Sequence, residues 1–164
     1  MEKSSKKIDW VIHYVAPTVD RSQSPDYFYE PYFSCIHTHG LDNHGHRELC
    51  LSIALDYNVA CALLNSMGQR IADGETVFTE GIRTDVLANG MDVQFISFDN
   101  DPTLYVILPD ANGKLPMDSN CEEPFCYQET YAKFISDNRE YIWNMRRKTH
   151  IKPLRWEDIY REPA

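Results

Sequence analysis

An alternating apolar segment that leads directly into an amphipathic helix places the strongest constraint on the fold of this chain. Larger apolar residues alternate with smaller ones at Leu49, Leu51, Ile53 and Leu55, the period-2 pattern of a β-strand with one buried face. Asp56 is a suitable N-cap, and apolar residues then recur at helical spacing to about Ala72, where Asp73-Gly74 ends the pattern. We therefore expect a sheet with this helix packed on it.

The other apolar segments predict further strands and a second long helix. The helix extends from Gln128 to about Arg147, and the strands fall at residues 10–15, 33–39, 77–78, 93–98 and 104–108. Asn100-Asp101-Pro102 suits a hairpin turn between the last two strands. Because strands and helices do not alternate regularly, we expect an α+β fold, a mainly antiparallel sheet with two principal helices packed on one face.

Length and composition predict one ordinary globular domain. The 164 residues, of which 43% are hydrophobic and 25% charged, are enough to bury a core without disulfides or structural metal. We expect a single domain over residues 1–164, with a long loop at about 17–32 and a C-terminal tail at about 150–164.

The charge balance narrows the class of partner. A formal net charge of −9 and an isoelectric point near 5.0 disfavour binding to nucleic acid or to an anionic membrane and favour a basic protein partner or a metal ion. No apolar run approaches the roughly 18 residues needed to span a bilayer. Five cysteines, an odd number, without a segment resembling a signal peptide predict a cytoplasmic protein with free thiols.

A histidine-rich segment carries the densest candidate chemistry. It reads His37-Thr-His39-Gly-Leu-Asp-Asn-His44-Gly-His46-Arg-Glu48. If Gly40–Asn43 forms a four-residue hairpin loop, His39 lies opposite His44, His37 opposite His46, and Cys35 opposite Glu48. All six side chains would then share one face of the hairpin.

Two interpretations of this segment remain open. His37, His39, His44 and His46 would hold Zn²⁺ or another divalent transition metal, with Glu48 as a ligand, an orienting group or the general base for a bound water. Alternatively, the segment is a polar loop whose histidines hydrogen-bond to backbone or water. The metal interpretation depends on the register, because a one-residue slip would divide the set between two faces.

Short motifs along the chain resemble those of the domain-of-unknown-function family DUF4262. They are Thr38-His-Gly-Leu41, Gly45-His46-Arg-Glu48-Leu49 and Leu108-Pro-Asp110-Ala-Asn-Gly113-Lys-Leu-Pro116-Met-Asp118. The resemblance covers about residues 33–128 and implies a small bacterial protein, without implying an activity. His46, Glu48 and Asp110 match polar motif positions, which makes Glu48 and Asp110 the candidate catalytic residues. Arg47 and Met117 depart from the family's usual Pro and Trp, and His37, His39 and His44 are not part of the pattern.

Two functional hypotheses follow from these observations. The first is a non-catalytic binding protein, of the immunity or inhibitor type, whose acidic surface holds a basic partner. The alternative is a metal-dependent hydrolase that uses the histidine cluster and Glu48. No Gly-rich phosphate loop, nucleophile elbow or dinucleotide fingerprint occurs in the sequence.

Overall fold

The computed structural model describes residues 8–15 and 32–143. Except for Tyr32, the loop predicted at about 17–32 and the tail predicted at about 150–164 lie outside these residues. Within the described part, none of the helices is long and apolar enough to cross a bilayer.

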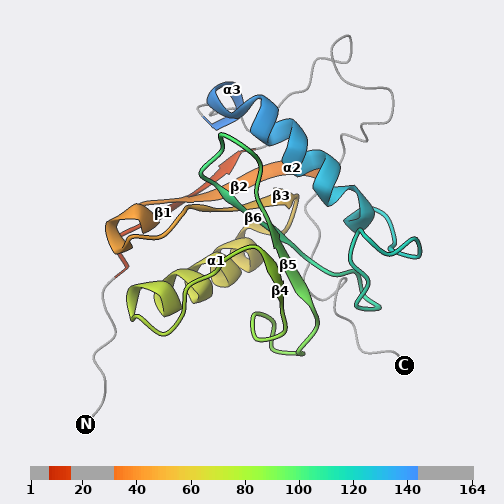
Figure 1. Cartoon of the computed structure of the whole chain (residues 1–164), viewed down its shortest axis with the longest axis horizontal. Helices are drawn as coiled ribbons and strands as arrows, with labels where there is room; N and C mark the ends of the chain where they lie inside the picture. The colour runs from red at the N-terminus through yellow and green to blue at the C-terminus, as the bar shows by residue number, and fades with distance from the viewer. Residues whose placement is uncertain (1–7, 16–31, 144–164) are drawn as a thin grey trace.

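A six-stranded sheet forms the centre of the molecule (Figure 1). Its spatial order is β1-β2-β3-β6-β5-β4. The parallel pair is β3 with β6, and the other neighbours are antiparallel, which confirms the mainly antiparallel α+β fold. The strands are β1 (Val11–Val15), β2 (Phe33–His39), β3 (Leu49–Ile53), β4 (Gly81–Arg83), β5 (Val93–Ile96) and β6 (Leu104–Ile107).

The first predicted helix is confirmed with its cap. The helix α1 comprises Tyr57–Ala72, and the Asp56 carboxylate accepts hydrogen bonds from the amides of Asn58 and Val59. The second predicted helix is interrupted, because α2 (Gln128–Asp137) is followed by Asn138 and then by a separate helix, α3 (Arg139–Trp143). Its predicted continuation over residues 144–147 lies outside the described residues. Asn138 leaves helical geometry, with φ −122° and ψ 29°.

The two principal helices lie on opposite faces of the sheet, so the expectation of one shared face is wrong. Figure 1 shows α1 below the sheet and α2 with α3 above it. One buried cluster joins α1 to Ile36, Leu49 and Leu51, whereas the other joins α2 to Phe33, Cys50 and Tyr105. Alternate residues of the same strands therefore enter two different cores.

This arrangement explains the burial of β3. The alternation of large and small residues predicts one buried face, yet all five residues of Leu49–Ile53 are buried. The larger residues face α1, while Cys50 and Ser52 lie on the α2 side, where the Ser52 hydroxyl donates to the Gln128 carbonyl. The alternation of large and small residues in this strand indicates the size of the side chains on each face. It does not indicate which face is solvated.

Trp10 fixes the β1 end of the sheet against α1. Its side chain is buried, and the indole N–H donates to Asn65 Oδ1 at 2.9 Å. A Cβ atom on Gly68 would approach the indole to 2.7 Å, and one on Gly40, whose φ is +123°, would approach the Trp10 backbone to 2.9 Å. Gly68 thus provides the space that the indole occupies, and Gly40 allows the close approach of the Trp10 backbone.

Candidate functional site

The register between β2 and β3 differs from the predicted register, which placed the four histidines on one face of a hairpin. His37 lies opposite Cys50, and Ile36 lies opposite Leu51. Residues 40–48 form the connection, which includes the 3₁₀-helix η2 (Leu41–His44), instead of a four-residue loop. His37 is therefore not paired with His46, and Glu48 is not paired with Cys35.

His46 is a buried structural residue beside Phe78. The Phe78 amide donates to Nε2 at 3.0 Å, so Nδ1 carries the ring proton and donates to the Arg47 carbonyl at 2.7 Å. Both ring nitrogens therefore already have backbone partners. The same contact holds Phe78 outside the sheet, and the strand predicted at 77–78 is wrong: β4 begins at Gly81.

His44 lies apart from the other histidines. Its Nε2 is 2.6 Å from Asp9 Oδ1, and its ring makes an edge contact with Trp10, with centroids 6.0 Å apart. It thereby connects η2 to the residues that precede β1.

His37 and His39 group instead with His13, a residue that the sequence interpretation missed. The His13 ring lies edge-on to His37, with centroids 5.2 Å apart, and stacks on His39 at 5.9 Å. His13 lies directly opposite His37 because β1 pairs antiparallel with β2. No local signal marks it, since His13 and His37 are far apart in the sequence and meet only through the pairing of the strands.

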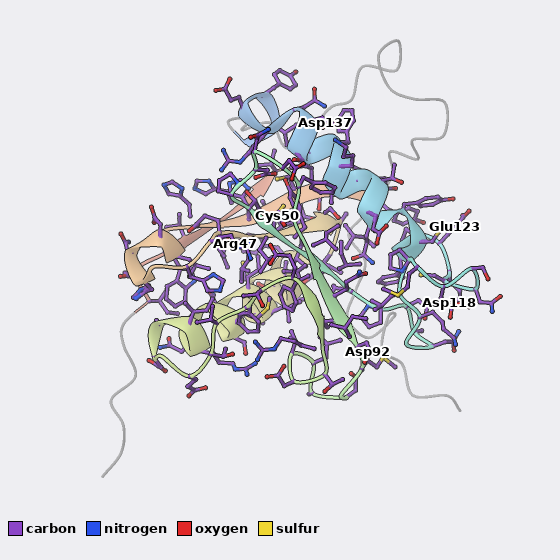
Figure 2. The ribbon with its side chains drawn as sticks, viewed as in Figure 1. Arg47, Cys50, Asp92, Asp118, Glu123 and Asp137 are labelled. Atoms are coloured by element: carbon purple, nitrogen blue, oxygen red, sulfur yellow. The ribbon has the colours of Figure 1, made fainter. Side chains whose placement is uncertain are left out.

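Buried polar groups extend beneath this histidine cluster on the α2 side of the sheet. Cys35 Sγ lies 3.5 Å from His37 Nδ1 and 3.7 Å from Cys50 Sγ. Nearby, the Tyr105 hydroxyl donates to Asp101 Oδ2 at 2.5 Å, and Arg139 Nε lies 3.3 Å from Asp101 Oδ1. Figure 2 places Cys50 in the layer between the sheet and α2.

Burial favours the neutral forms of His37, Cys50 and Tyr105. It is the main cause that lowers the pKa of His37 to about 3, with smaller effects from His13, His39 and Arg139. Burial likewise raises the pKa of the Cys50 thiol well above its ordinary range and raises that of Tyr105. The His37 imidazole and the Cys50 thiol are therefore uncharged at neutral pH.

The four histidines of the predicted metal site are not brought together in the structure. Within the described part of the chain, no three His, Cys, Asp or Glu side chains are grouped so as to hold a metal ion. The arrangement on which the hydrolase alternative depends, with Glu48 facing four convergent histidines, is not present.

Glu48 instead organises the β2–β3 connection. Its carboxylate accepts from the amides of Gly40 and Asp42 and from the Thr38 hydroxyl, at 3.0 to 3.2 Å. The amide of Leu49 in turn donates to Thr38 Oγ1 at 2.9 Å. Burial raises the pKa of Glu48, although these hydrogen bonds oppose the shift. The Thr-x-Gly-Leu and Gly-His-x-Glu-Leu segments are thus one hydrogen-bonded unit.

Asp110 has a similar role in the loop of residues 108–127, which connects β6 to α2 and which we call the acidic loop. Asp110 is fully buried, and its carboxylate accepts from the amides of Asn112, Lys114 and Glu122 at 2.8 to 2.9 Å. At the far end of the loop, the Gln128 side chain bonds both the amide and the carbonyl of Leu108 and the carbonyl of Phe125. The loop is therefore held at both ends by buried polar side chains.

The acidic loop presents carboxylates and one large apolar side chain to the solvent. Between Pro109 and Ala132 the sequence contains five acidic residues and one base, Lys114. Glu122 and Glu123 of the loop and Glu129 in the first turn of α2 are exposed, and Met117 of the loop is 59% exposed. Figure 2 shows Asp118 and Glu123 along one edge of the molecule.

The chain folds as a small α+β protein in which the motif residues His46, Glu48 and Asp110 accept hydrogen bonds from backbone amides of loops. A family model described as "Domain of unknown function (DUF4262)" matches residues 6–104, and the chain belongs to this family. The match begins earlier than the motifs indicated and ends at the first residue of β6, so Asp110 lies outside it. No curated protein and no solved structure matches the chain.

Proposed function

We propose that the protein is a non-catalytic binding protein, of the immunity or inhibitor type, that holds a basic protein partner against its acidic loop. The observation that carries this proposal is the loop itself, which is long, irregular and yet fixed by the buried Asp110 and Gln128 side chains. Long loops without regular structure in a compact domain are usually functional.

The rigidity of the loop favours binding. Asp110 and Gln128 fix the backbone before any partner arrives, so association does not carry the full entropy cost of ordering this segment. Cys121 adds a further contact, because its Sγ donates to the Lys114 carbonyl. The exposed carboxylates are consequently presented in a defined arrangement.

The charges on the loop favour a cationic partner. Glu122 accepts a hydrogen bond from the side-chain amide of Asn112, and Glu123 accepts one from the Tyr127 hydroxyl. Both donors are neutral, so they do not offset the negative charge of the two carboxylates. Together with the net charge of −9, these carboxylates would accelerate encounter with a basic surface. Met117 supplies an adaptable apolar contact in the middle of the charged residues.

A site-specific crosslink tests the proposal. A photoreactive residue at Met117 should capture a basic protein in cells, whereas the same residue at Val77, which is 68% exposed and outside the loop, should not. The captured protein is then purified, and its binding to the full chain is measured at low and at high ionic strength.

Charge-neutralised variants then assign the contact. The variant Glu122→Gln/Glu123→Gln/Glu129→Gln should slow association with the captured partner by about tenfold, and added salt should abolish the difference. The matched control is Asp42→Asn/Glu75→Gln/Asp92→Asn, which removes the same charge elsewhere and should have a much smaller effect. Equal effects of the two variants, or an affinity that does not depend on salt, would contradict the proposal.

A further inference from the structure

Two buried thiols from neighbouring strands meet beneath the histidine cluster. Cys35 of β2 and Cys50 of β3 are both fully buried, and their Sγ atoms are 3.7 Å apart. The register of β2 is irregular between Phe33 and Ile36, the segment that contains Cys35, and irregularities of this kind re-aim a side chain. In a disulfide bond, about 2.05 Å long, the two sulfur atoms would be closer by about 1.6 Å.

The surroundings of this thiol pair are polar on the side that leads to the solvent. Cys35 Sγ lies 3.5 Å from His37 Nδ1, the exposed His13 ring lies edge-on to His37, and the exposed His39 ring stacks on His13. Imidazoles can hydrogen-bond a small hydrophilic molecule, whereas the other side chains around the two thiols, such as Phe33 and Ile135, are apolar. A small oxidant would therefore enter along the histidines.

We propose that Cys35 and Cys50 form a site of reversible oxidation by peroxide, with a disulfide as the product. This inference is independent of the acidic loop and goes beyond the proposed binding function.

The chemistry balances with one peroxide and two thiols. Cys35 Sγ attacks a peroxide oxygen, the O–O bond breaks, and the thiol proton leaves with the hydroxide as water, which converts Cys35 to a sulfenic acid. Cys50 Sγ then attacks Cys35 Sγ, the S–O bond breaks, and a second water carries away the Cys50 proton. Two thiols are oxidised to a disulfide while hydrogen peroxide is reduced to two waters, and a small external thiol reverses the reaction.

The more exposed cysteines distinguish the proposal from oxidation that is governed by exposure alone. Cys61 and Cys126 are more exposed than the buried pair. If exposure alone governed oxidation, these thiols would react first. The geometry predicts instead that the first intramolecular disulfide joins the two fully buried positions.

The experiment treats the intact, reduced protein with hydrogen peroxide, alkylates the remaining thiols after denaturation, and maps the peptides by mass spectrometry without reduction. The expected result is a crosslinked pair of peptides containing Cys35 and Cys50, with the loss of two hydrogen atoms in mass, reversed by dithiothreitol. Because this readout uses the unaltered chain, it does not depend on whether any variant folds.

Two variants assign the steps. In Cys50→Ser the crosslink should be lost and a sulfenic acid should accumulate at Cys35, detected with dimedone, while Cys61→Ser, the matched control, should form the crosslink at the original rate. The proposal is overturned if Cys35 and Cys50 remain fully alkylated while the other cysteines are oxidised, or if the first disulfide joins a different pair.

Discussion

At the scale of single residues, the polar side chains that the motifs single out act mainly on the backbone. His46 accepts the Phe78 amide and donates to the Arg47 carbonyl, Glu48 accepts the amides of the β2–β3 connection, and Asp110 accepts three amides of the acidic loop. Buried amides need such partners, because a buried N–H without an acceptor costs about 1 to 3 kcal/mol. At these three positions, polar side chains therefore supply acceptors for amides where the chain leaves regular structure.

Replacing His46 with alanine should destabilise the protein. The substitution leaves the buried Phe78 amide without its acceptor and opens a void beside the Phe78 ring. We therefore expect the free energy of unfolding to fall by about 2 to 4 kcal/mol. Urea denaturation measures this loss. His39→Ala, at an exposed histidine, should change the stability by less than about 0.5 kcal/mol, and an equally small effect of His46→Ala would contradict the structural role.

His37 should make the stability depend on pH. Its pKa is lowered from 6.5 to about 3 in the folded protein, so between these values the unfolded chain binds more protons, and the free energy of unfolding decreases as the pH falls below 6.5. The decrease approaches about 1.4 kcal/mol per pH unit for one proton. Among the described residues, the titratable groups near His37 include His13 of β1, Cys35 and His39 of β2, Cys50 of β3 and Arg139 of α3.

The measurement is the free energy of unfolding in urea at intervals from pH 7 to pH 5. We expect His37→Gln to flatten the curve, because the variant lacks the group whose protonation opposes folding, while His39→Gln retains the slope of the wild type. A wild-type curve that is flat across this interval would show that His37 is protonated without penalty.

At the scale of elements, close contacts decide where small residues are needed. The helix α1 carries Gly68 at a buried position against Trp10. In an exposed helix, alanine is more favourable than glycine by about 1 kcal/mol. Here a Cβ atom would lie 2.7 Å from the indole, so the packing between α1 and the residues before β1 outweighs helix propensity.

Gly68→Ala should therefore destabilise the protein despite the better helix former. We expect a loss of about 1 to 3 kcal/mol from overpacking, together with a change in tryptophan fluorescence as the Trp10 ring moves. Ser66→Ala, at an exposed position of the same helix, should be neutral within about 0.5 kcal/mol. Thermal denaturation followed by fluorescence separates the two, and a stabilised Gly68→Ala would mean that the ring is displaced without cost.

At the scale of the whole molecule, the sheet separates two cores. Leu64 of α1 belongs to one core and Ile135 of α2 to the other, and both are fully buried. Side chains in different cores have no shared contacts, so the energetic effects of changing them should be independent. Two helices on one face would instead share contacts and couple.

A double-mutant cycle tests this separation. Leu64→Ala should cost about 3 kcal/mol and Ile135→Val about 1 kcal/mol, and the double variant should lose their sum within about 0.5 kcal/mol. Urea denaturation of the four proteins gives the coupling energy. A coupling energy above about 1 kcal/mol would indicate that the two side chains share a core.

Features that depend on neighbouring residues could be predicted from the sequence. The pattern and cap of α1, the ends of β2 and the turn between β5 and β6 follow from side-chain period, the Asp56 carboxylate and turn residues that act over a few positions. The family also follows from local motifs.

The face of the sheet that each helix covers depends on tertiary packing. Alternation along a strand distinguishes its two sides but does not show what packs on them. The tertiary structure also decided the candidate site: His13 joins His37, Cys35 meets Cys50, and Glu48 turns to the amides of its own loop. These contacts depend on strand pairing and on the length of one connection, and neither is encoded in the spacing of the histidines.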